Sequence, residues 1–363
     1  MPETPEAVQE LLDELGEMFG DEVNIGLGTD PKFFHPKISS GSHILDMMLD
    51  GGYRLGRYYY LYGPEGAGKT YLTYLGMASA QRWADEQGNG KIHAFIDAEE
   101  SWDPEWAAVC GVDPNRTYVS RPEKGDTALD LMEVLLRSKQ FQGIGCDSVA
   151  SLLPARELEK KLDERTMGEL ASLMSRGLRK VTPQLDDCAV FFINQVREKL
   201  GVMFGSPMTT PGGKALGFYS SLTLQITRGG LVKEDRPFFE VGKDEWTEAE
   251  RVVGHEIRIK SIKDKTGSMM QQTCSLWFKY DTNPKGIEEW DELWNIALME
   301  GILKRDKQTY YLANEDGEND KYAVHRQKAR DKFFDDNELH ERIKKTLNDR
   351  YQSRKYLDYN ENK

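Results

Sequence analysis

The chain has 363 residues, of which 39% are hydrophobic and 30% are charged, and its formal net charge is −13. This length suffices for one large core with small appendages or for two to three domains. The negative charge argues against a protein that passively coats nucleic acid, although a local basic groove remains compatible with it. No apolar run approaches the ~20 residues of a membrane span. The acidic, polar first ten residues predict no signal peptide.

Residues 1–35 predict an oligomerisation helix followed by a linker. Apolar side chains recur at helical spacing between Pro5 and Phe19, at Val8, Leu11, Leu12, Leu15, Met18 and Phe19. A helix this short cannot bury such a stripe alone. We therefore expect it to pack on the chain's own core or on a neighbouring subunit. The glycines and prolines between residues 24 and 37 indicate the linker.

Residues 36–284 alternate predicted strands and helices, which indicates an α/β domain with a doubly wound, mostly parallel sheet. The expected strands are 58–62, 92–97, 144–147, 189–194, 222–227, 256–263 and 274–280. The highly charged run 235–250 predicts an exposed excursion. Residues 285–363 are more polar, and we expect a small α+β C-terminal domain with helices at 290–299 and 338–347.

The segment GPEGAGKT at residues 63–70 fits the phosphate-binding pattern G-x-x-x-x-G-K-[ST]. A predicted strand precedes it and a predicted helix follows, the context in which backbone N–H groups point at phosphate oxygens. The N-terminus of that helix adds partial positive charge. Lys69 would reach the β- and γ-phosphates, and Thr70 would hold Mg²⁺. The sequence thus predicts a nucleoside-triphosphate site at Gly63, Pro64, Glu65, Gly66, Ala67, Gly68, Lys69 and Thr70.

Two strands predicted after this loop end in carboxylates. Asp147 closes the strand 144–147, where the Mg²⁺-coordinating acid of such enzymes lies, although an acid there can also simply start a turn. Glu99 and Glu100 follow the strand 92–97, and a carboxylate at this place can orient and deprotonate an attacking water. The residues alone do not decide between Glu99 and Glu100.

A third strand ends in Asn194 and Gln195. An amide side chain at this sheet edge can sense a γ-phosphate, or it can merely end the strand. The segment after it, residues 197–214, is long and rich in glycine, and long loops in compact domains are usually functional or disordered. Its cations can meet phosphates, and its apolar side chains can stack on bases. It is either a nucleotide-gated DNA-binding loop or a lid over the nucleotide.

Together these motifs resemble the RecA family of bacterial and phage homologous-recombination ATPases. The resemblance runs from about residue 35 to beyond residue 300. Besides the phosphate loop it rests on GSHILD at 41–46, FIDAE at 95–99, DP at 103–104, DSVA at 147–150, FINQ at 192–195, GVMFG at 201–205 and GGKALGFY at 212–219. The run 235–250 departs from the family pattern as an insertion.

The resemblance implies a role for particular residues around ATP. Glu99 matches the catalytic carboxylate, and Gln195 matches the γ-phosphate sensor. Residues beside the adenine are matched by Asp103, Trp106 and Tyr280. Lys263 and Lys265 match two lysines that reach the ATP of the adjacent subunit, so they count as catalytic and as interface residues, together with Phe218.

The resemblance also implies a DNA-binding set. It comprises Met167, Gly168, Arg179, Arg197, Lys199, Leu200, Gly201, Val202, Met203, Phe204, Gly205, Gly212, Gly213 and Lys214. The implied protein forms helical filaments on single-stranded DNA with ATP and Mg²⁺, hydrolyses ATP when DNA stimulates it, and exchanges strands with homologous double-stranded DNA. A single-strand-binding protein and loader proteins are further expected partners, no membrane is expected, and the expected location is the cytoplasm of a bacterium or a phage-infected host. A hexameric helicase and a non-exchanging DNA scaffold are the alternatives.

Overall fold

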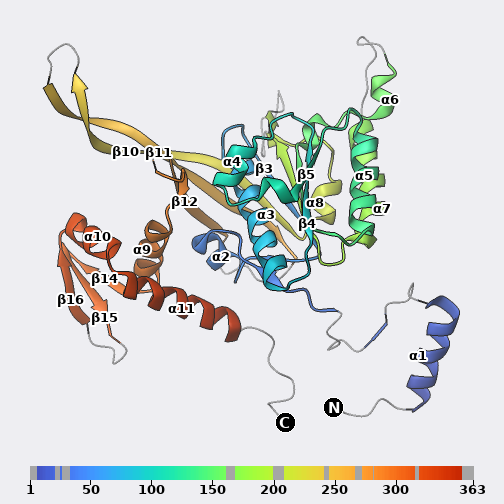
Figure 1. The fold of residues 1–363 in the computed structure, drawn as a ribbon, viewed down its shortest axis with the longest axis horizontal. Coiled ribbons are helices and arrows are strands. Elements are labelled where there is room, and N and C mark those ends of the chain that lie inside the picture. Colours follow the sequence, from blue (N-terminus) through green and yellow to red (C-terminus); the bar gives the residue numbers. More distant parts are fainter. Residues whose placement is uncertain are drawn as a thin grey trace.

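The computed structural model describes residues 6–20, 25–26, 33–160, 168–198, 208–240, 245–265, 272–280, 282–314 and 319–353. The described part is an α/β fold with a large central sheet and a small C-terminal unit (Figure 1). This arrangement confirms the expected fold class.

The central sheet has the strand order β13-β12-β11-β10-β3-β7-β6-β4-β5. Its parallel part runs from β10 to β5, and β10 to β13 pair in antiparallel fashion. The strands are β3 (Arg57–Gly63), β4 (Ile92–Asp97), β5 (Thr117–Ser120), β6 (Phe141–Asp147), β7 (Ala189–Gln195), β10 (Leu222–Glu240), β11 (Glu245–Asp264), β12 (Thr273–Lys279) and β13 (Gly286–Ile287).

Helices cover both faces of this sheet, as Figure 1 shows. Successive residues of β3 point to opposite faces, as a strand requires. Tyr58 and Tyr60 join the core beneath α5 and α7, whereas Tyr59 and Leu61 join the core beneath α3. The helices and short helical turns of the main domain are α2 (His43–Met48), α3 (Lys69–Glu86), α4 (Pro104–Val109), η3 (Pro114–Arg116), α5 (Gly125–Arg137), η4 (Val149–Ser151), α6 (Ala155–Leu158), α7 (Glu169–Val181), η5 (Thr182–Gln184) and α8 (Ala215–Tyr219).

Two short strand pairs flank the main sheet. In the first pair, β1 (Lys37–Ile38) is antiparallel to β2 (Tyr53–Arg54). This pair ties the start of the main domain to the residues just before β3. The second, β8 (Arg197–Glu198) with β9 (Met208–Thr209), brings the two ends of the segment after β7 together. At the N-terminus, α1 (Glu6–Phe19) contributes no buried residue. None of the helices in the described segments is long and apolar enough to be a membrane span.

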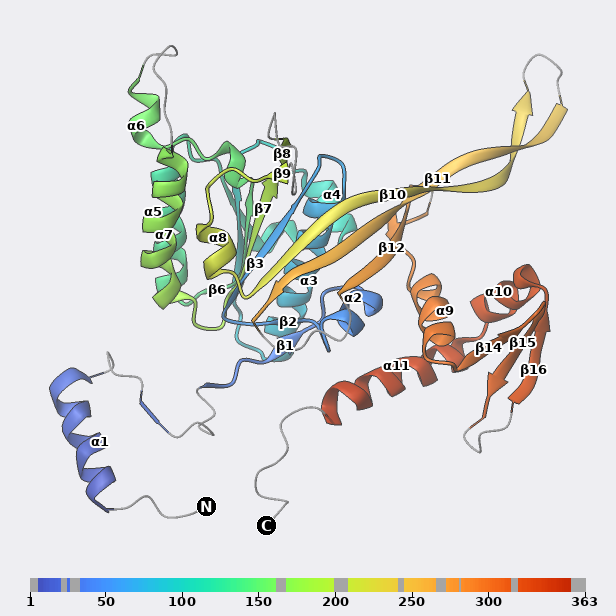
Figure 2. The ribbon, with the colours of Figure 1, turned by 180° about the vertical axis from the view of Figure 1, so that it is seen from behind.

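β10 and β11 extend far beyond their neighbours as a two-stranded ribbon (Figure 2). β3 pairs with β10 only over Leu222–Gln225, and β12 pairs with β11 only over Gly254–Lys260. The ladder between β10 and β11 nevertheless continues to the pair Glu240↔Glu245. The strands expected at 222–227 and 256–263 were therefore too short. Beyond these pairings the two strands pair only with each other, and their charged sequence carries no apolar alternation that would indicate a strand.

The C-terminal unit packs helices against a three-stranded antiparallel sheet. Its elements are α9 (Glu289–Met299), β14 (Leu303–Asp306), β15 (Thr309–Ala313), β16 (Asn319–Val324), α10 (Arg326–Phe334) and α11 (Asn337–Ser353). The two expected helices correspond to α9 and α11. The pattern gave no signal for α10, because only Ala329 and Phe333 of that helix are buried.

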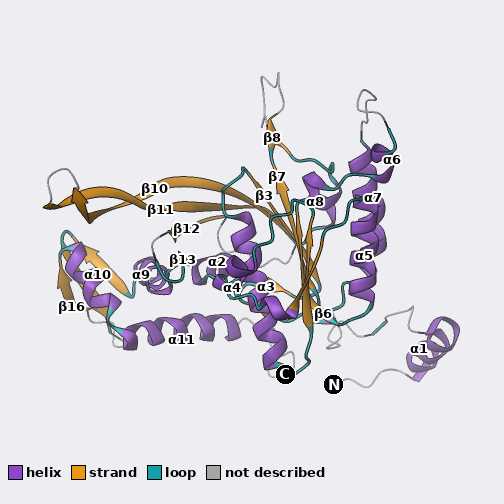
Figure 3. Cartoon of the chain, turned by 45° about the horizontal axis from the view of Figure 1, so that its top comes forward, coloured by secondary structure: helices purple, strands orange, loops and turns teal. Residues whose placement is uncertain are grey.

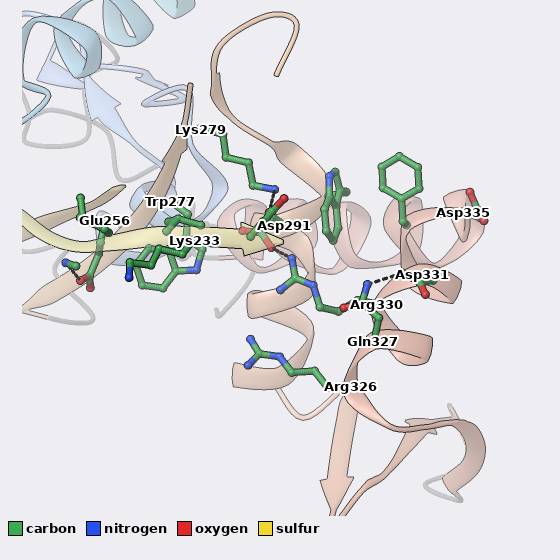
Figure 4. Close-up of a pocket in the computed structure, with 16 residues that line it drawn as sticks. Lys233, Glu256, Trp277, Lys279, Asp291, Arg326, Gln327, Arg330, Asp331 and Asp335 are labelled. Carbon is green, nitrogen blue, oxygen red and sulfur yellow. Dashed lines mark hydrogen bonds and ion pairs between the residues drawn. The ribbon is translucent and has the colours of Figure 1, made fainter. Parts of the chain in front are cut away.

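A cavity of about 1120 Å³ separates the ribbon base from α9 and α10 (Figure 4). Ion pairs cross its lining: Lys279 lies 2.8 Å from Glu288, and Arg330 lies 2.5 Å from Asp291. The Arg330 guanidinium also lies over the Trp290 ring, 4.9 Å from the centroid. The basic side chains of this cavity are thus largely matched by acids, and it lies apart from residues 63–70.

The side chain of Trp294 packs in the core of the C-terminal unit. It is fully buried, with its ring centroid 5.4 Å from that of Tyr310 and 5.3 Å from that of Phe333. We expect Trp294→Ala to lower the free energy of unfolding by ~3–5 kcal/mol, because it removes a large ring and leaves a cavity. Urea titration followed by circular dichroism measures this. Met299→Ala on the same helix, at a residue that is 51% exposed, should cost less than ~1 kcal/mol. Equal costs would contradict this account of the core.

Candidate active site

The predicted phosphate loop lies between the end of β3 and the start of α3. Gly68 caps α3 with a φ of 97°, a left-handed conformation that favours glycine. The Lys69 ammonium donates to the carbonyls of Gly63, at 3.1 Å, and Pro64, at 2.7 Å, so it sits inside the loop. Burial lowers the pKa of Lys69, and the carboxylates of Asp147 and Glu99 oppose this shift. The lysine therefore faces the place where a phosphate would enter.

Thr70 and Asp147 meet beside this loop. The Thr70 hydroxyl donates to Asp147 Oδ2 at 2.7 Å. Burial raises the pKa of Asp147 to about 6, and the nearby Glu99 carboxylate adds to the rise. One hydroxyl and one carboxylate are hard oxygen ligands of the kind that Mg²⁺ uses next to substrate phosphates and water. Within the described residues, no group of three or more His, Cys, Asp or Glu side chains forms an all-protein metal site. The pair fits a Mg²⁺ that phosphates help to hold.

Glu99 lies where three strand ends converge. Its Oε1 atom accepts hydrogen bonds from Gln195 Nε2 at 2.9 Å, from Ser151 Oγ at 3.2 Å and from Ser148 Oγ. The neighbouring Glu100 is exposed and has a φ of 54°. Of the two acids that the sequence left open, Glu99 is the one that the fold turns toward Gln195.

Asp97 fixes the turn that carries Glu99. This carboxylate is fully buried, and it accepts hydrogen bonds from the backbone N–H groups of Ser101, at 2.8 Å, and Trp102, at 3.2 Å. Arg121 Nε donates to it at 3.0 Å. Sequence reasoning overlooked Asp97 as a positioning group, although it stands in the same run of acids.

The side chains of Asn194 and Gln195, at the end of β7, have different hydrogen-bond partners. Gln195 bonds to Glu99, as described above. Asn194 is fully buried, and its side-chain amide donates to the Tyr60 hydroxyl at 3.0 Å and to the Pro211 carbonyl at 2.9 Å. Asn194 therefore ties the end of the strand to the far end of the segment that begins at Arg197.

An aromatic cavity of about 250 Å³ adjoins the phosphate loop. Trp106 lines it and stacks on Tyr71, with 5.8 Å between the ring centroids. Tyr280 does not line it; instead its hydroxyl lies 2.8 Å from Nδ1 of His255, which does. Asp103 caps α4 by accepting from the N–H groups of Glu105 and Trp106. The sequence gave no reason to select His255, which lies on a strand far from the recognised motifs.

Apart from Gly212 and Gly213, the expected DNA-binding residues fall into three groups. Gly168 begins α7 with a φ of 79°, Arg179 is exposed near the end of that helix, and Lys214 is exposed at the start of α8. For Arg197 the backbone alone is described, in β8. The remaining positions in the two loops lie outside the described residues, namely Met167, Lys199, Leu200, Gly201, Val202, Met203, Phe204 and Gly205.

Gly212 and Gly213 connect the two loop regions. Both have left-handed φ angles, 82° and 70°, and a Cβ on Gly213 would lie 2.7 Å from the Ala171 Cβ on α7. The end of the second segment therefore rests on the helix that begins at the end of the first. Figure 3 shows α6 and β8, from which the undescribed stretches start, at the same end of the molecule.

Lys263 and Lys265 lie against the C-terminal end of α8. Lys263 Nζ donates to the carbonyls of Phe218, at 2.9 Å, and Ser220, at 2.8 Å, and also to that of Gly217. Lys265 Nζ donates to the Phe218 carbonyl at 2.7 Å. Burial, with Lys265 adding repulsion, lowers the pKa of Lys263 to about 8. The Phe218 ring beside them is 67% exposed, so the three residues share one surface patch.

Comparison with known proteins places this geometry in context. Residues 6–281 match the family model described as RecA N-terminal domain. The chain is 38% identical over 316 residues to Protein RecA of Pseudomonas putida, covering 86% of this chain and 82% of that protein. It is 36% identical over 311 residues to Protein RecA of Mycoplasma mycoides subsp. mycoides SC, covering 85% and 83%.

The position of Lys69 leads to a first test of the site. We expect Lys69→Ala to weaken ATP binding at least ~10-fold, because the loop loses the cation that charge-assisted hydrogen bonds to phosphate require. Nucleotide-dependent DNA binding should be lost with it. Titration with a fluorescent ATP analogue measures the first effect. Lys124→Ala, at an exposed lysine before α5, serves as the control. Unchanged affinity in Lys69→Ala would overturn the nucleotide-site assignment.

Proposed function

The chain belongs to the RecA family and is a DNA-dependent ATPase of homologous recombination, and we propose how its residues perform that activity. We propose that subunits assemble head-to-tail on single-stranded DNA, with ATP and Mg²⁺ at each junction, and exchange that strand with homologous duplex. The observation that carries the proposal is the hydrogen bond between Glu99 and Gln195. It joins the candidate catalytic carboxylate to the strand that leads into the second DNA segment.

The phosphate loop and its neighbours bind the nucleotide. Residues 63–70 would surround the phosphates with N–H groups, and Lys69 would neutralise the β- and γ-phosphates. Thr70 and Asp147 would hold Mg²⁺, which would screen the charge of the phosphates and of the leaving group. The Trp106 ring and the cavity that it lines would receive the base, while Asp103 and Tyr280 support the walls of that cavity.

Glu99 is the proposed general base. A carboxylate near the γ-phosphate can orient the attacking water and accept its proton. In this structure all three donors contact Oε1, so Glu99 acts on water either through its second oxygen, Oε2, or after Oε1 loses a donor. Gln195 is one of these donors. A γ-phosphate that attracts the Gln195 amide would therefore release Glu99 and at the same time pull on β8 and the residues that follow it.

DNA binding is assigned to the residues around both loops. Arg179, Arg197, Lys199 and Lys214 would meet phosphates, and Met203 and Phe204 would stack on or wedge between bases. Gly212 and Gly213 support this role through their contact with α7, which lets the two segments move as one surface. The remaining members of the set are Met167, Gly168, Leu200, Gly201, Val202 and Gly205.

The patch of Phe218, Lys263 and Lys265 is the proposed junction with a neighbouring subunit. A head-to-tail contact that does not close on itself produces a filament. Across it the two lysines would leave the α8 carbonyls and offset γ-phosphate charge on the neighbour's ATP. Their present contacts support this role. The neutral carbonyls hold the two ammonium groups close together at the surface, and a phosphate, which is charged, would bind them more strongly and replace the carbonyls.

We propose a division of the chain that follows from these roles. Residues 1–35 would serve oligomerisation, residues 36–284 form the ATPase core with its DNA segments, and residues 285–363 form a separate C-terminal domain. A single-strand-binding protein and loaders are proposed partners, and we propose the cytoplasm of a bacterium or phage-infected host as the location. Strand exchange assayed with homologous and heterologous duplexes tests the whole proposal. Equal yields with both duplexes would reject it.

Glu99→Gln tests the catalytic assignment. We expect ATP and DNA binding to persist while DNA-stimulated hydrolysis slows by ~10² or more, because an amide cannot accept the proton of water. Phosphate release in the presence of single-stranded DNA measures the rate. The matched control is Glu100→Gln at the exposed neighbouring acid. A large effect of the control with little effect of Glu99→Gln would show that the wrong acid was assigned.

Mixed assemblies test catalysis across the junction. Lys263→Ala and Lys265→Ala subunits should each bind ATP but lose DNA-stimulated hydrolysis. Mixing either variant with Lys69→Ala subunits should restore part of the activity, because one partner supplies the phosphate loop and the other supplies the lysines. ATP hydrolysis as a function of mixing ratio measures the recovery, and light scattering verifies that mixed assemblies form. Absence of recovery at every ratio, with assembly verified, would refute catalysis in trans.

A further inference from the structure

Three donors from two different segments converge on a single oxygen of Glu99. Gln195 Nε2 lies 2.9 Å from Oε1, Ser151 Oγ lies 3.2 Å from it, and Ser148 Oγ donates to it as well. A carboxylate oxygen offers two lone-pair directions, so a third donor must compete for them. Ser151 makes the longer of the two measured contacts, and its residue is exposed, whereas Ser148 is fully buried. Ser151 is thus the hydroxyl that can leave most easily.

Ser151 lies between the nucleotide site and the first DNA segment. It ends the short helical turn η4 after Asp147, and α6 begins four residues later. The chain between them is fastened to the start of α5, where Gly125 N–H donates to the Leu153 carbonyl at 2.8 Å. Asp126 accepts from the Ala155 N–H at 2.8 Å. Only three residues separate Ser151 from α6, so a displacement that carries α6 together with the start of α5 also shifts Ser151.

Gln195 supplies the equivalent link from the other segment. It ends β7, and β8 begins two residues later at Arg197. Ser151 and Gln195 therefore belong to separate stretches of chain, each followed by a proposed DNA-binding loop, and both hold the same carboxylate atom. A displacement of η4 or of the end of β7 therefore changes how firmly Glu99 is held.

We propose that Ser151 is a positioning residue through which the first DNA segment controls Glu99, in parallel with Gln195. In the absence of DNA the Ser151 hydroxyl helps to keep the carboxylate turned toward its donors and away from water. DNA binding near Gly168 withdraws η4, and Glu99 becomes free to orient the attacking water. This inference rests on the proposed function, because it takes Glu99 as the general base.

The Ser151→Ala variant of the full chain tests the inference. Steady-state hydrolysis is measured without DNA and with saturating oligothymidylate, and kcat and KM for ATP are determined in both conditions. We expect the DNA-free kcat to rise about fivefold, within the range for one lost hydrogen bond and below its upper end, because Ser148 and Gln195 still donate to Oε1. The DNA-saturated kcat and KM for ATP should stay within about twofold, because Ser151 has already been withdrawn there.

Two further variants separate positioning from a general structural effect. Ser151→Thr keeps a hydroxyl and should restore the low DNA-free kcat. Ser138→Ala removes an exposed hydroxyl that donates to the Leu135 carbonyl at 2.6 Å at the end of α5, and it should behave like the unmodified chain. An unchanged DNA-free kcat in Ser151→Ala would overturn the proposal. So would equal behaviour of the Ala and Thr variants, or a joint fall in kcat with a rise in KM.

Failure of this inference is distinguishable from failure of the proposed function. If Glu99→Gln hydrolyses ATP at the normal rate, the catalytic assignment itself is wrong. If Glu99→Gln is slow while Ser151→Ala is indistinguishable from the unmodified chain, Glu99 is the base and only the control by Ser151 is rejected.

Discussion

The parallel pairing of β4, β6, β7 and β3 is the constraint on which the site depends. These strands are buried on both faces, so their side chains within the sheet are largely apolar, and polar groups gather where the strands end. Parallel strands bring their carboxyl ends to one edge. That edge receives Gly63, Asp147 and Gln195, with Glu99 two residues beyond β4. The chemistry thus follows from topology, because no other edge of the sheet collects these groups.

The charged side chains at this edge, Asp147, Glu99 and Lys69, interact with one another electrostatically. Asp147 and Glu99 are both acids, and burial, with the nearby Glu99 carboxylate adding to it, raises the pKa of Asp147. Lys69 offsets part of that repulsion, and donors on Thr70, Ser148 and Gln195 satisfy carboxylate oxygens. Such a network is costly when it is incompletely satisfied in a low dielectric. Under the proposed function, ATP and Mg²⁺ would replace several of these internal partners at once, and the loss of the Glu99–Gln195 bond would reach the end of β7.

Sequence reasoning succeeded where function requires a contiguous pattern and was weak where it requires contacts across the fold. The phosphate loop, Asp147, Glu99 and Gln195 follow predicted strands, and the structure brings them together. Ser151 and His255 carry no local signal, because a hydroxyl or an imidazole becomes informative only through the atom that it meets. The ribbon of β10 and β11 was underestimated for a different reason. Alternating apolar residues mark a strand that is buried on one face, and the charged sequence of this ribbon shows no such alternation over most of its length.

The short helix α8 connects the proposed DNA segment to the proposed subunit junction. The two glycines at 212–213 rest on α7, and Lys214 leads directly into α8, which is only five residues long. The carbonyls at the C-terminal end of α8 hold Lys263 and Lys265. A helix of this length has no internal hinge, so a shift of residues 208–214 displaces those carbonyls as well. Asn194 anchors the same segment through Pro211. The proposed γ-phosphate sensor Gln195, which follows Asn194, the proposed DNA segment and the proposed junction lysines are therefore joined by packed contacts, through which a movement at one of them would reach the other two.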